Sequence, residues 1–136
     1  MNTLKRKAEL QFLAEMVQFV ANSATLSGFS QEILNDIKLI AEEIIVNIIG
    51  HGYSNNAGDI EISCWLEGEN KFITEIVDSG IAFDILKKED PDLSLGISER
   101  PIGGLGILLI KKLADDVEYR RLKEKNILKF VILKSK

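Results

Sequence analysis

The spacing of apolar residues changes along this chain, and that change limits its possible folds more than any other feature. Residues 8–26 and 30–50 place apolar side chains every three to four positions, which predicts two amphipathic helices. Residues 60–66 instead alternate apolar and polar side chains, and a second apolar run follows over 71–77. The turn Gly68-Glu69-Asn70 separates the two runs, so the pattern predicts a β-hairpin.

The remaining segments complete an α+β pattern. A short helix over 107–114 and two strands over 117–122 and 127–133 follow a long loop-like segment, and the first six or seven residues are an edge-strand candidate. Hairpins imply a mostly antiparallel mixed sheet whose apolar face the helices must cover. The predicted fold class is therefore α+β, a two-layer α/β sandwich with helices on one face, formed by a single domain over residues 1–136.

Composition argues against several functional classes. A formal net charge of -4 disfavours nucleic acid as the main ligand, because phosphate neutralisation requires a clustered basic surface. Cys64 is the only cysteine, so no intrachain disulfide forms, and no apolar run has the roughly 20 residues that span a bilayer. Acidic and amide side chains interrupt the apolar stretch after Lys5-Arg6-Lys7, unlike in a signal peptide. We therefore expect a cytoplasmic protein.

A polar stripe runs along the second predicted helix. Glu43, Asn47 and His51 lie four residues apart and so share one helix face. The stripe is either the solvent face or a buried polar site. Apolar side chains surround it, and a helix that is apolar nearly all round should be buried, so a metal ion or polar ligand would have to pair with the carboxylate and the amide. For His51 alone, a hydrogen-bonded histidine at a helix end is the simpler interpretation.

A second motif, Asp78-Ser79-Gly80, places a carboxylate where a predicted buried strand ends. The simpler interpretation is a turn, since these three residue types are common in turns. The functional interpretation is that Asp78 accepts a hydrogen bond from an exocyclic amine such as that of adenine. Gly80 would then let the backbone approach the flat ring closely.

The third motif, Gly103-Gly104-Leu105-Gly106, leads into the last predicted helix. It is either a flexible turn or an anion site, because a helix N-terminus offers unpaired amides and a favourable dipole. The Gly-Lys-Ser/Thr sequence of a Walker loop is absent, and so is the third glycine of a dinucleotide-binding fingerprint.

Together, the three motifs resemble the boxes of the Bergerat-fold ATPases, which include histidine kinases, gyrase-type ATPases and anti-sigma kinases. They occur in the family's order at residues 43–53, 78–84 and 99–106, so the resemblance covers almost the whole chain. Phe83-Asp84 after the second box and Glu99-Arg100-Pro101 before the third resemble one branch in particular, the anti-sigma factor serine/threonine kinases.

The resemblance implies roles for residues of the first two boxes. Glu43 would be the general base that takes a proton from a serine or threonine hydroxyl, and Asn47 would bind Mg²⁺. Asp78 would read adenine, and Gly80 and Ala82 would make room for the base. Ala82 replaces a glycine that many Bergerat ATPases have at this position.

The resemblance implies further ATP contacts from His51 and from the third box. Gly103, Gly104 and Gly106 would cradle the phosphates as part of a mobile lid. Arg100 would neutralise charge on the γ-phosphate, unless it is a solvated arginine of the lid.

The implied function is an ATP- and Mg²⁺-dependent kinase that phosphorylates an anti-anti-sigma-type protein and sequesters a sigma factor, a mechanism known as partner switching. Family members are often dimers, so the resemblance also implies a homodimer, whereas it implies no direct contact with nucleic acid or membrane. Three alternatives stay open: a nucleotide-gated binding protein without kinase activity, a detached histidine-kinase-type catalytic domain, and a structural domain without a ligand.

Overall fold

The computed structural model describes residues 1–52, 58–82, 84, 86 and 104–135. The order of the predicted elements is confirmed, including the edge strand at the N-terminus. In chain order the elements are β1 (Asn2–Lys7), the 3-10 turn η1 (Leu10–Phe12), α1 (Leu13–Leu26), α2 (Gln31–Asn47), the π-helical turn η2 (Ile48–Gly52), β2 (Asp59–Glu67), β3 (Lys71–Asp78), α3 (Gly104–Leu113), β4 (Asp116–Leu122) and β5 (Lys125–Leu133).

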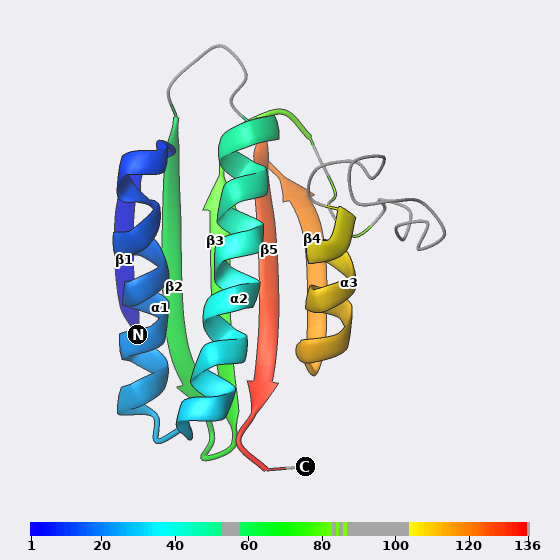
Figure 1. Ribbon diagram of the computed structural model, residues 1–136. Coiled ribbons are helices and arrows are strands. Elements are labelled where there is room, and N and C mark those ends of the chain that lie inside the picture. Colours follow the sequence, from blue (N-terminus) through cyan, green and yellow to red (C-terminus); the bar gives the residue numbers. More distant parts are fainter. Residues whose placement is uncertain (53–57, 83, 85, 87–103, 136) are drawn as a thin grey trace.

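The described strands form one sheet in the order β1-β2-β3-β5-β4, and each pairing between them is antiparallel (Figure 1). The hairpin of β2 and β3 turns at Gly68, whose φ of 67° favours glycine. In the register of the sheet, Asp78 at the end of β3 pairs with Ile60 on one side and Asn126 on the other. The pairing therefore brings together two polar residues that are distant in the sequence.

The helices α1 and α2 cover one face of the sheet, and α3 lies beside α2 (Figure 1). The predicted two-layer α+β sandwich is confirmed. Within the described part of the chain, no helix combines the length and apolar character that crossing a bilayer requires. The core between the layers contains the buried side chains of Met16, Val20, Ile37, Ile40, Ile44, Ile62, Phe72, Ile76, Ile107, Ile110 and Phe130.

The other face of the sheet carries charged pairs between strands, one from β3 to β4 across β5 and one between the neighbouring strands β4 and β5. Glu75 lies 3.8 Å from Arg120, and Lys129 lies 4.0 Å from Glu118. Exposed ion pairs of this kind contribute only about 0–1 kcal/mol each. The stability of the fold therefore comes mainly from the core on the helix-covered face.

The start of α1 differs from the prediction. The predicted helix begins at residue 8, but the Ala8 N–H donates to the Gly58 carbonyl at 2.8 Å and the next residues form the turn η1. Leu10, which the sequence pattern assigns to the apolar stripe, is consequently 67% exposed. Contact with the chain before β2 therefore prevails over helical periodicity here. The last helix also differs, since α3 begins at Gly104 rather than at residue 107.

Both ends of α2 affect the site described below. The helix begins as predicted, with Oγ of Ser30 accepting a hydrogen bond from the Ile33 N–H at 3.4 Å. At its C-terminal end it widens into the π-helical turn η2, which contains the backbone of His51. Turns of this type are rare and often occur at functional sites.

The core residue Ile76 offers a test of this architecture. It lies in β3 and is fully buried against the helices. We expect Ile76→Ala to lower the free energy of unfolding by about 2–5 kcal/mol, because it leaves a cavity between sheet and helices. Leu122→Ala, at an exposed position of the edge strand β4, should change it by less than about 0.5 kcal/mol. Urea denaturation followed by circular dichroism measures both values, and equal losses would contradict the described core.

Candidate active site

Asp78 ends β3 inside the protein rather than at its surface. Its side chain is only 4% exposed, so the carboxylate needs polar partners. Oδ1 accepts hydrogen bonds from the Gly80 N–H and from Nδ2 of Asn126, both at 2.9 Å. The first bond closes the turn that the sequence predicts at this position. The second ties the turn to β5.

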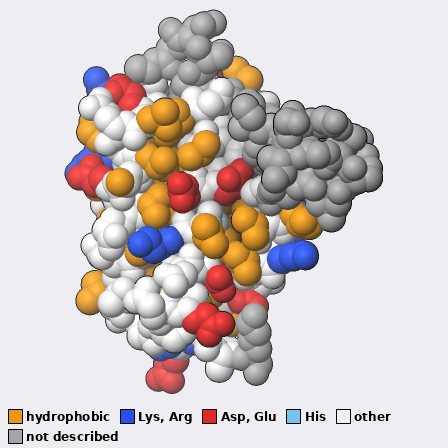
Figure 2. Space-filling model, viewed as in Figure 1, with side chains coloured by type: hydrophobic (Ala, Val, Ile, Leu, Met, Phe, Trp, Pro, Cys, Tyr) orange, Lys and Arg blue, Asp and Glu red, His pale blue; other side chains and the backbone are white. Residues whose placement is uncertain are grey.

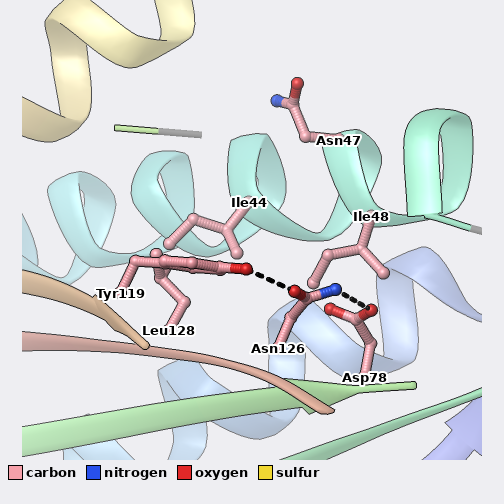
Figure 3. A pocket seen from close by; sticks show the side chains of 7 residues that line it. All are labelled: Ile44, Asn47, Ile48, Asp78, Tyr119, Asn126 and Leu128. Carbon is pink, nitrogen blue, oxygen red and sulfur yellow. Dashed lines mark hydrogen bonds between the residues drawn. The ribbon is translucent and has the colours of Figure 1, made fainter. Parts of the chain in front are cut away.

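Asn126 holds the turn through four hydrogen bonds. Its Nδ2 donates to Asp78 at 2.9 Å and to the Ile81 carbonyl at 2.8 Å. Its Oδ1 accepts from the Tyr119 hydroxyl at 2.5 Å (Figure 3). Nη1 of Arg121 donates to the same oxygen at 3.1 Å. A side-chain amide has two N–H donors and two acceptor positions, so Asn126 is fully paired and its orientation is fixed.

Arg121 brings a positive charge to the same turn. Its Nη1 also donates to the Gly80 carbonyl at 2.8 Å. Burial raises the pKa of Asp78 above its ordinary value of 3.8, whereas the hydrogen bonds from Asn126 and Gly80 and the charge of Arg121 lower it. Burial has the largest effect, so the net shift of the Asp78 pKa is upward.

A small cavity lies beside Asp78, between α2 and the sheet (Figure 3). It is lined by Ile44, Asn47, Ile48, Asp78, Tyr119, Asn126 and Leu128. Apolar walls with a few polar groups are typical of sites for small molecules. The carboxylate of Asp78 is the acidic group among these lining residues, so the cavity offers a hydrogen-bond acceptor beside apolar walls.

Glu43 and Asn47 lie one helical turn apart on α2 and contact each other. Nδ2 of Asn47 donates to the Glu43 backbone carbonyl at 2.7 Å and to the carboxylate oxygen Oε1 at 3.0 Å. Both acceptors are oxygens, so the amide nitrogen faces Glu43 and Oδ1 faces away from it. In Figure 3 the Asn47 amide projects from the opposite side of α2 to the side chains of Asp78 and Asn126. Asn47 therefore borders the cavity while its amide faces elsewhere.

The helix α3 packs on Glu43 through Gly106. Gly106 is buried in the first turn of α3, and a Cβ atom at this position would overlap the Glu43 side chain. The missing side chain therefore lets α3 approach α2 closely. This packing role was not predicted from the sequence, and a contact between Gly106 and phosphate stays a prediction.

The structure brings the predicted residues together in two groups. Glu43, Asn47 and Gly106 meet where α2 contacts α3. Asp78 and Gly80 meet at the end of β3. Asn47 and Asp78 border the same cavity, so the two groups lie on either side of one helix.

The other predicted ATP contacts lie outside these two groups or outside the described residues. Ala82 is exposed after the turn, and Gly104 is the first residue of α3. The backbone of His51 lies in η2, but its side chain is outside what the structure describes. Arg100 and Gly103 also lie outside the described residues, together with most of the predicted lid. Their roles in ATP binding stay predictions.

Sequence analysis missed Asn126, Tyr119 and Arg121, which complete the surroundings of Asp78. Asn126 lies 48 positions from Asp78 and reaches it only because β5 pairs with β3. One signal was present, since Asn126 comes directly before the apolar run predicted as the last strand. A polar side chain that such a strand buries needs a hydrogen-bonding partner.

The fold and these two residue groups define a class of protein. The sequence profile of the family described as "Histidine kinase-like ATPase domain" matches residues 7–132. The chain belongs to this family of ATPase domains.

Within the family, the chain is similar to serine-protein kinases named RsbW. It is 31% identical over 119 residues to RsbW of Bacillus thuringiensis (strain Al Hakam), which covers 85% of this chain and 74% of that protein. The same values hold for RsbW of Bacillus anthracis (strain CDC 684 / NRRL 3495). The predicted resemblance to the serine/threonine kinase branch of the superfamily is confirmed.

Solved structures show the same fold at lower sequence identity. The RsbU and RsbW domains of a Mycobacterium tuberculosis protein align over 98% of this chain with a TM-score of 0.63 and 12% identity. The histidine kinase domain of a blue-light activated kinase from Erythrobacter litoralis aligns over 91% with a TM-score of 0.58 and 16% identity. This chain spans 33% of the first solved chain and 61% of the second. At these identities the likeness shows the fold alone.

The buried carboxylate of Asp78 makes stability depend on pH. Its pKa is higher in the folded than in the unfolded protein, so folding disfavours the ionised form. The contribution of Asp78 to stability therefore falls as the pH rises from its ordinary pKa of 3.8 through the raised pKa that it has in the folded protein.

The variant Asp78→Asn tests this pH dependence, because it keeps an acceptor oxygen but does not titrate. We expect the free energy of unfolding of the wild type, relative to this variant, to fall across that pH window. Urea denaturation at a series of pH values measures the difference, and a constant or rising difference would contradict the buried position.

Proposed function

We propose that this chain is an ATP-dependent serine/threonine protein kinase that phosphorylates a protein partner. The observation that carries the proposal is the arrangement of Glu43, Asn47 and Asp78 around one helix, with the last two bordering one cavity. They supply a base for proton transfer, an amide oxygen for a cation and a buried acceptor for a nucleobase. Similarity to serine-protein kinases over 85% of the chain supports serine or threonine as the acceptor.

The adenine base would enter the cavity with its amino group directed at Asp78. Oδ1 already accepts two hydrogen bonds, so the amine would donate to Oδ2. Asn126 has no donor or acceptor left for the base and instead fixes the position of the carboxylate. Guanine presents a carbonyl oxygen where adenine has its amine, and two acceptors repel each other. The site therefore favours adenine.

The Asn47 amide fits a Mg²⁺-bound triphosphate. Mg²⁺ prefers oxygen ligands and retains several waters, so it takes few ligands from the protein. The two hydrogen bonds that Nδ2 makes to Glu43 leave Oδ1 as the ligand atom. When bound, the ion would neutralise charge on the phosphates. Among the described residues, no cluster of three or more His, Cys, Asp or Glu side chains offers a competing cation site.

Glu43 is the proposed general base. Its carboxylate would accept the proton of the substrate hydroxyl while the hydroxyl oxygen bonds to the γ-phosphorus. The bond from that phosphorus to the bridging oxygen breaks, and ADP leaves with its electrons. The hydrogen bond from Asn47 to Oε1 keeps the base beside the cation ligand.

Partner switching is the biological role we propose for this kinase. The substrate would be an anti-anti-sigma-type protein, and the sequestered partner would be a sigma factor. Phosphorylation adds about 1.5 to 2 negative charges, which lowers the affinity of an interface that has no matching positive charge. The similarity to RsbW kinases supports both partners for this chain.

Glu43→Gln tests the proposed base. Glutamine keeps the shape and an acceptor for Asn47 but cannot take up a proton, so phosphorylation of a purified anti-anti-sigma-type protein should fall about 10²–10⁴-fold. Mg-ATP affinity should be retained. Glu42→Gln, at an exposed neighbouring position, is the matched control and should transfer phosphate at the normal rate. Transfer from labelled ATP gives the rates, and acid-stable label distinguishes phosphoserine from phosphohistidine. A normal rate for Glu43→Gln would remove this residue from the mechanism.

Gly106→Ala tests the contact between α3 and the base. The new methyl group would displace the Glu43 side chain from Asn47. Alanine also favours helix by about 1 kcal/mol, which offsets part of the strain. We expect slower phosphate transfer with a change in unfolding free energy of less than about 1 kcal/mol. The double variant Gly106→Ala with Glu43→Gln decides whether this contact matters. If its loss of phosphate transfer, expressed as free energy, equals the sum of the losses in the two single variants, the residues act independently and the contact is irrelevant to catalysis.

A further inference from the structure

Two exposed leucines lie beside the proposed base. Leu39 on α2 is 46% exposed and Leu109 on α3 is 40% exposed. Single exposed apolar residues are common on protein surfaces and by themselves indicate nothing. The position of this leucine pair relative to Glu43 is what distinguishes it from other exposed apolar residues of the chain, such as Leu26 at the end of α1.

The packing of α2 and α3 places both leucines on the same side of the contact between the helices. The two helices run in opposite directions, and they contact each other at Glu43 and Gly106 (Figure 1). Leu39 lies four residues before Glu43, and Leu109 lies three residues after Gly106. Both leucines are thus one helical turn from the contact, in the same direction.

Each residue of the leucine pair is followed in its helix by a buried core residue. Ile40 and Ile110, the residues that follow Leu39 and Leu109, are fully buried in the core. The two leucines therefore lie at the surface of a packed helix junction. Figure 2 shows hydrophobic side chains gathered over α2 and α3, directly below acidic side chains.

We propose that the leucine pair is the docking surface for the protein substrate, an inference that rests on the proposed kinase function. The substrate hydroxyl must come within hydrogen-bonding distance of the Glu43 carboxylate. The chain that carries this hydroxyl must therefore lie over the residues around Glu43, and among the described residues the leucine pair offers exposed apolar surface one helical turn from the contact of Glu43 with Gly106. Its occupant is a serine- or threonine-bearing segment of the partner protein.

The spacing also defines what this segment should contain. One helical turn is about 5.4 Å, and an extended chain advances about 3.3 Å per residue. An apolar side chain about two positions from the acceptor serine or threonine would therefore reach the leucine pair while the hydroxyl reaches Glu43. Burial of apolar side chains at the centre of an interface is a common source of binding energy.

The test compares the double variant Leu39→Gln and Leu109→Gln with the wild type. Glutamine retains helix propensity and removes the apolar surface. The probe is the purified anti-anti-sigma-type protein that the wild type phosphorylates. We expect the KM for this protein to rise about tenfold or more, with unchanged Mg-ATP affinity. Leu26→Gln is the matched control on a distant helix, where leucine is 83% exposed, and should keep the wild-type KM.

Three results would overturn the docking surface: an unchanged KM in the double variant, an equal rise in the control, or a matching loss of Mg-ATP affinity, which would indicate structural damage. Failure of the wild type to phosphorylate any such protein would instead overturn the kinase function itself. The two failures are distinguishable because the second appears before any variant is made.

Discussion

The hydrogen bonds of Asn126 are the interaction on which the nucleobase end of the site depends. This one amide joins the end of β3, the following turn, β4 and β5. Without it, Asp78 would lose one of the two groups that donate to Oδ1 and would be a poorly compensated carboxylate in the core. A fully paired amide has one stable orientation, so the position of the acidic group is set by the sheet and not by the ligand.

Helix α2 divides the site into two halves with different chemistry. On its sheet side, Ile44 and Ile48 form the apolar wall of the cavity that ends at Asp78. Where α3 packs on it, Glu43 and Asn47 supply charge and hydrogen-bonding groups. A nucleotide has the same division, with a flat base at one end and charged phosphates at the other. Because α3 approaches α2 closely at Gly106, any movement of α3 changes the surroundings of Glu43, the proposed general base. The two helices therefore act as one unit in the proposed mechanism.

Much of the fold was predictable, because periodicity reports which side of each element is buried. The stripe of Glu43 and Asn47 was visible in the same way, since four-residue spacing places both on one face of a helix. The contacts of Asn126 to Asp78 and Ile81 were not, because they depend on strand register between residues more than 40 positions apart. The packing of Gly106 against Glu43 was also hidden, since glycines near a helix start suggest anion binding before they suggest helix packing. The start of α1 was wrong because a backbone contact to Gly58 outweighs local periodicity.

The central claim is that Asp78, Asn126 and Asn47 form one site for Mg-ATP, and ligand-dependent thermal unfolding tests it most directly. A ligand at about 100 times its Kd stabilises the folded state by roughly 2.7 kcal/mol, which in a domain of this size raises Tm by about 5–10 °C. We expect such a shift with Mg-ATP, a smaller one with Mg-GTP, and a reduced one when EDTA removes the magnesium. An absent shift at millimolar Mg-ATP, or an equal shift with GTP, would contradict a Mg-ATP site formed by these residues.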